Sequence, residues 1–271
     1  MISLKKLLEA SVIDLDKERL RRTMIDFAES EIEWLDVLQK LAAGMKEKLS
    51  GKKTNKLMVA SKEPEPVRTK DQLKQHVKDA GNWKDWYHDN HTYLKTIIED
   101  EEHLKKFLKI LAATSMAAKV DANATMAIKQ FKKMVLDGVL TPEGFTGLSA
   151  VKTNLSKVAQ GQDIEGPKVG PYSKALAGDP NAVAVDRHIF EIIFGTPSDS
   201  DKKRDVAKKM IAEVAEEMGL EPRQVQAALW AANQIRKNVT PQNYIQIIEK
   251  KKKQLQEIVE QLKVQHAETV A

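Results

Sequence analysis

Apolar residues recur at intervals of three and four along most of the chain, which is the spacing of one face of an α-helix. The pattern is present over residues 17–49, 83–94, 104–134, 151–160, 201–218 and 222–235. It stops over residues 49–69, where Lys, Ser, Gly and Pro predominate, as is typical of a linker. No stretch alternates apolar and polar residues long enough to indicate a strand. The sequence therefore predicts an all-α protein.

These segments suggest three regions. Residues 1–80 form an N-terminal helical extension with a flexible linker near 50–69, residues 81–240 a helical core, and residues 241–271 a C-terminal helix. The long helix at 17–49 either packs on its own domain or binds a partner. The two terminal helices also make a homo-oligomer possible.

Several helix ends can be assigned from single residues. Gly81 and Gly219 fit helix C-termini, and Thr240 followed by proline fits the start of the last helix. Asp121 or Asn123 is expected to cap a helix that follows the turn at Thr114, Ser115 and Met116. In the helix from 222, the spacing places residues 225, 228, 229, 232 and 235 inward.

A Gly/Pro-rich hairpin interrupts the helical pattern in the middle of the chain. It reads Gly166-Pro167-Lys168-Val169-Gly170, and a short helix is expected from Ser173 to Ala177. Glycines allow a close approach of the backbone, and N–H groups at such a turn can bind an anion. Lys168 and Lys174 add positive charge. The hairpin is either a phosphate-binding element or a simple helix connector.

A single aspartate follows the hairpin after an apolar run, Ala182 to Val185. Asp186 is predicted to cap a helix that begins Arg187-His188-Ile189-Phe190. Capping aspartates are common, so the position alone does not indicate chemistry. His188 either orients Asp186, contacts phosphate or is a structural histidine.

Trp83, Trp86 and Tyr87 lie close together in a chain that has only 5% aromatic residues. Helical spacing places them on one side, so they either anchor the core or form a wall on which bases stack. His88 and His91 have a spacing that two metal ligands could use, but no further cluster completes a site. We expect no metal.

Composition narrows the function classes. The 271 residues are 42% hydrophobic and 31% charged, with a net charge of +5 and a pI near 9.0, which permits nucleic-acid binding without requiring it. The absence of cysteine excludes disulfides, thiolate metal sites and a cysteine nucleophile. No apolar run approaches the length of a membrane span, and no signal peptide is evident. We expect a cytoplasmic protein without a membrane partner and without a cofactor.

The hairpin and the motif Val185-Asp186-Arg187-His188-Ile189 together resemble the signature of the helix-hairpin-helix DNA glycosylase superfamily, with its endonuclease III-like fold. The resemblance covers residues 83–238 and is strongest to divergent members carried by bacteriophages. It implies a helical DNA-binding core in which Asp186 is catalytic. It also implies that Gly166, Pro167, Lys168, Val169, Gly170, Lys174, Arg187 and His188 contact DNA. The base pocket would be lined by Trp83, Trp86, Tyr87, Thr114, Ser115 and Met116.

The chain departs from the family pattern at two important positions. Tyr172 stands where bifunctional members have the lysine that attacks the sugar, so the resemblance implies hydrolysis without a lyase step. Met116 stands where the family has a glutamine that fills the space of the extruded base. The expected function is that of a monofunctional DNA glycosylase acting on a damaged or modified base, with Asp186 and Tyr172 at the reacting centre.

Three other functions remain compatible with the sequence. The chain could be a DNA-binding module that has lost the reaction, or a glycosylase-like fold used for base hypermodification of phage DNA. Oligomerisation or binding of a protein partner through the long terminal helices could instead be its main role. The sequence does not name the base.

Overall fold

The structure is a computed structural model and describes residues 64–116, 118–197 and 200–270. These residues form helices joined by loops, and no strand occurs among them, so the predicted all-α class is confirmed. The helix expected at 17–49 and most of the linker near 50–69 lie outside the described residues. No described helix combines the length and the apolar character needed to cross a membrane.

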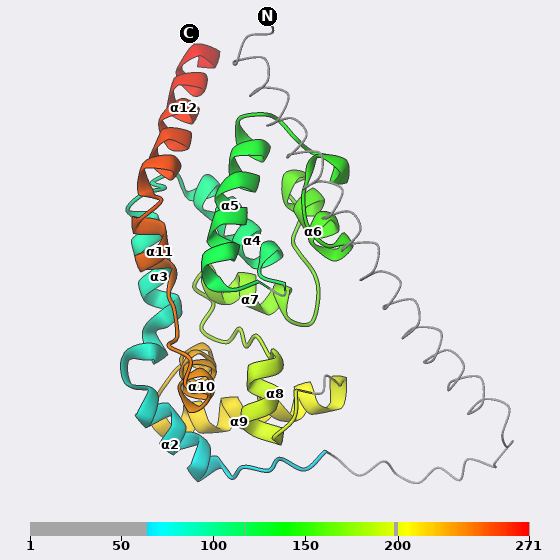
Figure 1. The fold of residues 1–271 in the computed structure, drawn as a ribbon, viewed down its shortest axis with the longest axis vertical. Helices are drawn as coiled ribbons and strands as arrows, with labels where there is room; N and C mark the ends of the chain where they lie inside the picture. The colour runs from blue at the N-terminus through cyan, green and yellow to red at the C-terminus, as the bar shows by residue number, and fades with distance from the viewer. Residues whose placement is uncertain (1–63, 117, 198–199, 271) are drawn as a thin grey trace, which may run out of the picture. The chain divides into compact units, whose positions relative to one another are not determined.

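The described helices follow one another through a single compact unit (Figure 1). Their bounds are α2 (Lys70–Ala80), η1 (Gly81–Asp85), α3 (Trp86–Lys95), α4 (Glu101–Thr114), α5 (Val120–Val135), η2 (Pro142–Gly144), α6 (Ser149–Ala159), α7 (Val169–Leu176), α8 (Arg187–Phe194), α9 (Asp201–Met218), α10 (Pro222–Arg236), α11 (Tyr244–Glu249) and α12 (Lys252–Val270).

Two hydrophobic cores hold this unit together. The larger core is built mainly from α3 to α7 with α11 and the first half of α12, and it contains the fully buried Phe107, Phe131 and Tyr244. The smaller core is built from α2, α8, α9 and α10, and Phe190 is buried in it. Trp83 packs against both cores. The boundary between the two cores is therefore where a cavity can form without breaking either one.

Helix starts are set by side chains that accept hydrogen bonds from the first free backbone N–H groups. The Asp186 carboxylate accepts from the N–H groups of His188 and Ile189, so the predicted cap of α8 is confirmed. Thr69 and Ser200 do the same for α2 and α9. Gly219 ends α9 as the sequence predicted, and its backbone there is left-handed.

The predicted cap of α5 is wrong. The helix begins after Lys119, without a side-chain cap, and both Asp121 and Asn123 lie inside it. Asn123 is instead buried, where its amide donates to the Leu111 carbonyl at 3.1 Å and accepts from the Thr114 hydroxyl at 2.6 Å. The side chain is therefore used to join α4 to α5 and not to cap its own helix.

The helix after the hairpin begins earlier than predicted, at Val169 and not at Ser173. Pro171 is tolerated there because the N–H groups of a first helical turn have no partner within the helix. Gly166 has a φ of 129°, a left-handed value that favours glycine, and it marks the turn of the hairpin.

The predicted start of the last helix at Thr240 is also wrong, because α11 begins at Tyr244. Asn243 caps the helix locally by accepting from the N–H group of Gln246 at 3.1 Å. The side-chain oxygen of Asn90 on α3 adds to this by accepting from the N–H groups of Tyr244 and Ile245 at 2.8 and 3.2 Å. The contact from Asn90, 154 residues away, cannot be seen in local sequence, whereas the cap at Asn243 is local. In α10, Ile235 is 47% exposed and does not point inward as predicted, because the last turn of that helix is exposed.

Candidate functional site

A cavity of about 940 Å³ lies between the two cores. Its walls come from α3, α5, α7, α8, α10 and α11, with the loops after α4 and before α11. Both cores contribute directly, since Trp86 and Tyr244 belong to the larger core and Val185 and Phe190 to the smaller one. The volume falls in the range of small-molecule sites.

One wall of the cavity is aromatic, and Trp86 is at its centre. The Trp86 ring stacks on Tyr172 at a centroid distance of 6.3 Å and an interplanar angle of 28°. It also contacts Tyr87, Trp230 and Tyr244 at centroid distances of 5.1, 5.8 and 5.4 Å. These rings come from α3, α7, α10 and α11. The wall offers flat apolar faces of the kind on which a planar ring can stack.

A chain of polar groups runs behind this wall. The hydroxyls of Tyr172 and Tyr244 lie 3.0 Å apart, and the Asn123 amide donates to the Tyr244 oxygen. Burial raises the pKa of Tyr244 to about 12 and that of Tyr172 well above its usual value. Both phenols therefore keep their protons at neutral pH and act as hydrogen-bond donors or acceptors, not as phenolates.

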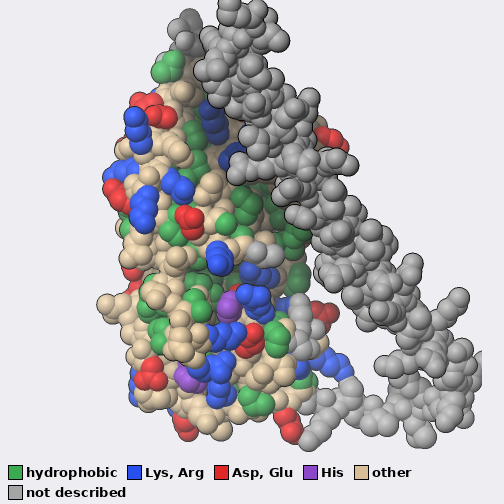
Figure 2. All heavy atoms as spheres, in the orientation of Figure 1, with side chains coloured by type: hydrophobic (Ala, Val, Ile, Leu, Met, Phe, Trp, Pro, Cys, Tyr) green, Lys and Arg blue, Asp and Glu red, His purple; other side chains and the backbone are tan. Residues whose placement is uncertain are grey.

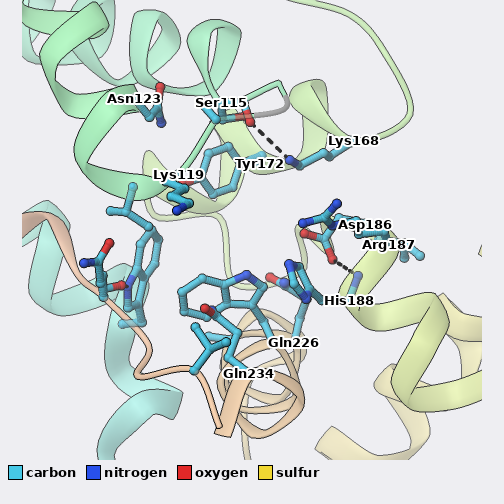
Figure 3. A pocket seen from close by; sticks show the side chains of 18 of the residues that line it. Ser115, Lys119, Asn123, Lys168, Tyr172, Asp186, Arg187, His188, Gln226 and Gln234 are labelled. Atoms are coloured by element: carbon cyan, nitrogen blue, oxygen red, sulfur yellow. Dashed lines mark hydrogen bonds between the residues drawn. The ribbon is translucent and has the colours of Figure 1, made fainter. Parts of the chain in front are cut away.

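Asp186 faces the same cavity from the start of α8 (Figure 3). One carboxylate oxygen, Oδ1, accepts from the N–H groups of His188 and Ile189 at 2.9 and 3.2 Å. The other oxygen has no hydrogen-bond partner within the part of the chain that the structure describes. Burial raises the pKa of Tyr87, and the charge of Asp186 raises it further. The carboxylate is thus fixed by backbone contacts while one oxygen is left for a ligand.

His188 lies beside Asp186 and is held from behind by α10. The Asn233 amide nitrogen, a donor only, is 3.2 Å from His188 Nδ1, so Nδ1 accepts and the ring proton is on Nε2. The same amide donates to Glu191 at 2.8 Å. Burial lowers the pKa of His188, and the charge of Arg187 acts in the same direction. A neutral imidazole with an N–H donor results at neutral pH.

Positive charge gathers around the cavity. Lys119, Lys168, Arg187 and Lys237 all line it. Lys237 pairs with Glu191, whereas Lys119, Lys168 and Arg187 have no carboxylate partner among the described residues. Figure 2 shows Lys and Arg side chains gathered around a histidine on this face of the molecule. Three cations without counter-charges are free to bind an anionic ligand such as phosphate.

The structure brings half of the sequence-predicted site residues to this one cavity. They are Trp86, Tyr87, Ser115, Lys168, Tyr172, Asp186, Arg187 and His188. Figure 3 shows the labelled Tyr172, Lys168 and Ser115 on one side of the cavity, with Asp186 and His188 on another. Lys168 reaches from the hairpin to the Ser115 carbonyl at 3.5 Å. Residues far apart in sequence therefore share one site.

The other predicted residues lie elsewhere. Thr114 is buried behind the wall with its hydroxyl bound to Asn123, and Trp83 and Met116 pack against the larger core. Val169 is buried in the same core, so only its backbone is able to reach a ligand. The remaining hairpin residues do not line the cavity, namely Gly166, Pro167, Gly170 and Lys174.

Sequence reasoning missed several residues of the wall. Tyr244 is among them, as are Gln226, Trp230 and Gln234, which lie on one face of α10. Their spacing of four residues is a signal that was present in the sequence, because such residues share one side of a helix. Asn243 directly before Tyr244 is a local signal for the start of α11, whereas the contact of Tyr244 N–H with Asn90 exists only in the folded chain.

Comparison with known proteins identifies one family. Residues 71–239 match the model of a family of unknown function, DUF7178. The chain belongs to this DUF7178 family. The matched DUF7178 residues contain most of the cavity lining, including Asp186 and the face of α10, but end before Tyr244. No curated protein and no solved structure matches the chain.

Proposed function

We propose that the protein binds DNA, receives one extruded base in the cavity, and hydrolyses its N-glycosidic bond. The observation that carries this proposal is the placement of Asp186. Its carboxylate is fixed by backbone N–H groups, has one oxygen available, and faces an aromatic wall in a cavity lined by cations. A carboxylate, a stacking surface and phosphate-binding groups are the parts that such a reaction uses.

The reaction follows from the charge that develops on the sugar. As the bond between the anomeric carbon and the base nitrogen breaks, its electron pair leaves with the base and the sugar becomes positively charged. Asp186 stabilises that charge and takes a proton from the water whose oxygen attacks the anomeric carbon. The base nitrogen takes up a proton in turn. The products are a free base and a sugar that carries a hydroxyl in place of the base.

The surroundings of Asp186 suit an extruded nucleotide. Trp86 and Tyr172 offer rings on which the base can stack, which offsets the cost of about a few kcal/mol of leaving the DNA stack. Lys119, Lys168 and Arg187 are available for the flanking phosphates. The hydroxyl of Tyr172 is bound to Tyr244, which supports a role in the wall and not as a nucleophile.

A second candidate function is DNA binding without a reaction. Its support is that capping of α8 by itself explains the position of Asp186. The two candidates differ in what the carboxylate charge does, and an asparagine at this position tests that difference because it caps a helix as well as aspartate does.

The deciding experiment is base release from DNA by the wild-type chain and by Asp186→Asn. DNA from several phages and bacterial hosts is incubated with each protein, and free bases are measured by mass spectrometry. We expect release by the wild-type chain and a loss of at least about a hundredfold in the variant, which is typical of removing a group that stabilises the transition state.

Equal release by both proteins contradicts the role of Asp186. Salt-dependent DNA binding with no release from any DNA selects the non-catalytic function. A new adduct on the DNA in place of a free base selects base hypermodification. As a matched control, Asp205→Asn makes the same charge change on α9, away from the cavity, and leaves release unchanged.

A further inference from the structure

Helix α10 presents a stripe of three side chains to the cavity. Gln226, Trp230 and Gln234 are spaced by four residues, and all three line it. A rise of about 1.5 Å per residue places successive members about 6 Å apart along the helix. The stripe therefore sets an aromatic ring between two amides that lie about 12 Å apart along the helix, so one edge of a base can meet one amide at a time.

The Gln226 amide is oriented by Tyr87. The Tyr87 hydroxyl, which is buried, donates to Gln226 Oε1 at 2.6 Å. This direction is required because Tyr87 has one proton and no other acceptor for it among the described residues. The amide nitrogen Nε2 is then the free end. It has no hydrogen-bond partner in the described part of the chain, although Gln226 is only 4% exposed.

Gln234, two turns further along α10, also has an amide nitrogen without a hydrogen-bond partner among the described residues, and this Nε2 is buried. Figure 3 shows Gln226 and Gln234 together on one side of the cavity, across from Tyr172. A buried donor without a partner costs about 1–3 kcal/mol. A ligand acceptor would relieve that cost at Gln234, and it would give the free nitrogen of Gln226 a partner.

We propose that α10 selects bases that carry a keto oxygen where other bases carry an exocyclic amino group. The inference rests on the proposed function, because it concerns the base that enters the cavity. Uracil, thymine, guanine and hypoxanthine offer an acceptor at that ring position, whereas cytosine and adenine offer a donor. An amino group facing either amide nitrogen leaves that nitrogen unpaired, which is the basis of strong rejection by polar sites.

Two pairs of bases that differ at this position, and in the proton on the adjacent ring nitrogen, test the selection. Four duplexes of one sequence carry uracil, cytosine, hypoxanthine or adenine at one site, opposite an abasic analogue so that base pairing does not contribute. Affinity is measured by fluorescence anisotropy with Asp186→Asn, which keeps the helix cap. We expect uracil and hypoxanthine to bind about tenfold more tightly than cytosine and adenine, as one or two hydrogen bonds would give.

Equal affinity for the four duplexes, at a level above the same duplex without an unpaired base, overturns the selection and leaves the proposed function intact. Absence of binding to every duplex overturns both. The two results differ, so the experiment tells a failure of the base selection from a failure of the proposed function.

Two variants assign the selection to α10. Gln226→Glu replaces the free donor with an acceptor, and we expect the tenfold preference to fall to about twofold or to reverse. Gln256→Glu makes the same change at an exposed position of α12 and keeps the preference.

Because a buried glutamate can unfold the chain, Tyr87→Phe provides a second test of the selection. It frees the amide to rotate and is expected to abolish the preference, and an unchanged preference in the folded Tyr87→Phe protein contradicts the proposal.

Discussion

The hydroxyl groups of Tyr172 and Tyr244 lie 3.0 Å apart and join α7 to α11 across 72 residues of sequence. Asn123 donates to the Tyr244 oxygen from the opposite side. The two tyrosines thereby tie the helix after the hairpin to a C-terminal helix, and the aromatic wall of the cavity depends on both.

Removing either hydroxyl should have unequal effects on stability. Tyr244→Phe leaves the buried Asn123 amide with an unpaired hydrogen, so we expect a loss of about 1–3 kcal/mol in the free energy of unfolding. Tyr172→Phe removes one hydrogen bond of a half-buried group and should cost about 0.5–1.5 kcal/mol. Urea denaturation of the two variants measures the difference. A larger loss for Tyr172→Phe would contradict this account.

Substitutions of Asp186 should separate helix capping from charge. Asp186→Ala removes the acceptor for two N–H groups at the start of α8, and we expect it to lower the free energy of unfolding by about 1 kcal/mol. Asp186→Asn keeps the acceptor and should change stability by only a few tenths of a kcal/mol. Thermal unfolding of both variants checks this, and equal destabilisation would show that the cap is not what holds the helix start.

His188 should make the protein less stable as the pH falls. Its pKa is lowered in the folded protein, chiefly by burial, so below about pH 6.5 the unfolded chain binds a proton before the folded chain does. Stability is then lost with a slope of up to about 1.4 kcal/mol per pH unit for this one proton. Asp186, Arg187, Glu191 and Lys237 are the charged groups that act on it.

The measurement is urea denaturation at pH 7.5 and pH 5.5. His188→Gln cannot be protonated, so the loss of stability between the two pH values should be smaller in the variant. His76 also has a pKa lowered by burial, and it titrates in both proteins. The comparison with the variant therefore isolates His188, and identical losses would refute its contribution.

Cations that line the cavity should determine the salt dependence of DNA binding. Lys119→Ala, Lys168→Ala and Arg187→Ala each remove one charge that has no carboxylate partner among the described residues. If each contacts one phosphate, the slope of log affinity against log salt should become shallower by about 0.9 per substitution on duplex DNA. Anisotropy titrations at several salt concentrations measure the slope. Lys78→Ala, at an exposed position of α2, is the control and should leave the slope unchanged.

Local patterns predicted much of the fold. The spans of α2 and α9 and the cap of α8 follow from Gly81, Gly219 and Asp186, because each acts through the backbone within a few residues. The start of α11 did not follow from Thr240, because Asn243 is the cap and Asn90 supports the same helix start through a tertiary contact.

The candidate site was predictable where its residues belong to recognisable motifs. Asp186, His188 and Lys168 were singled out on that basis, and all three line the cavity. Gln226 was not, although it shares the four-residue spacing of Trp230 and Gln234, because its orientation depends on a hydrogen bond from Tyr87, 139 residues away. Partners that meet only after folding leave no mark in local sequence.

The contact between Asn90 and the start of α11 has a practical consequence for anyone who works with shorter pieces of this protein. The residues that match the family end at 239, whereas Tyr244 lies just beyond them. A fragment cut at the matched boundary would keep Asp186 and α10 but lose one side of the wall, and Asn90 would have no backbone to cap. The smallest piece that retains the whole cavity must therefore extend at least through α11.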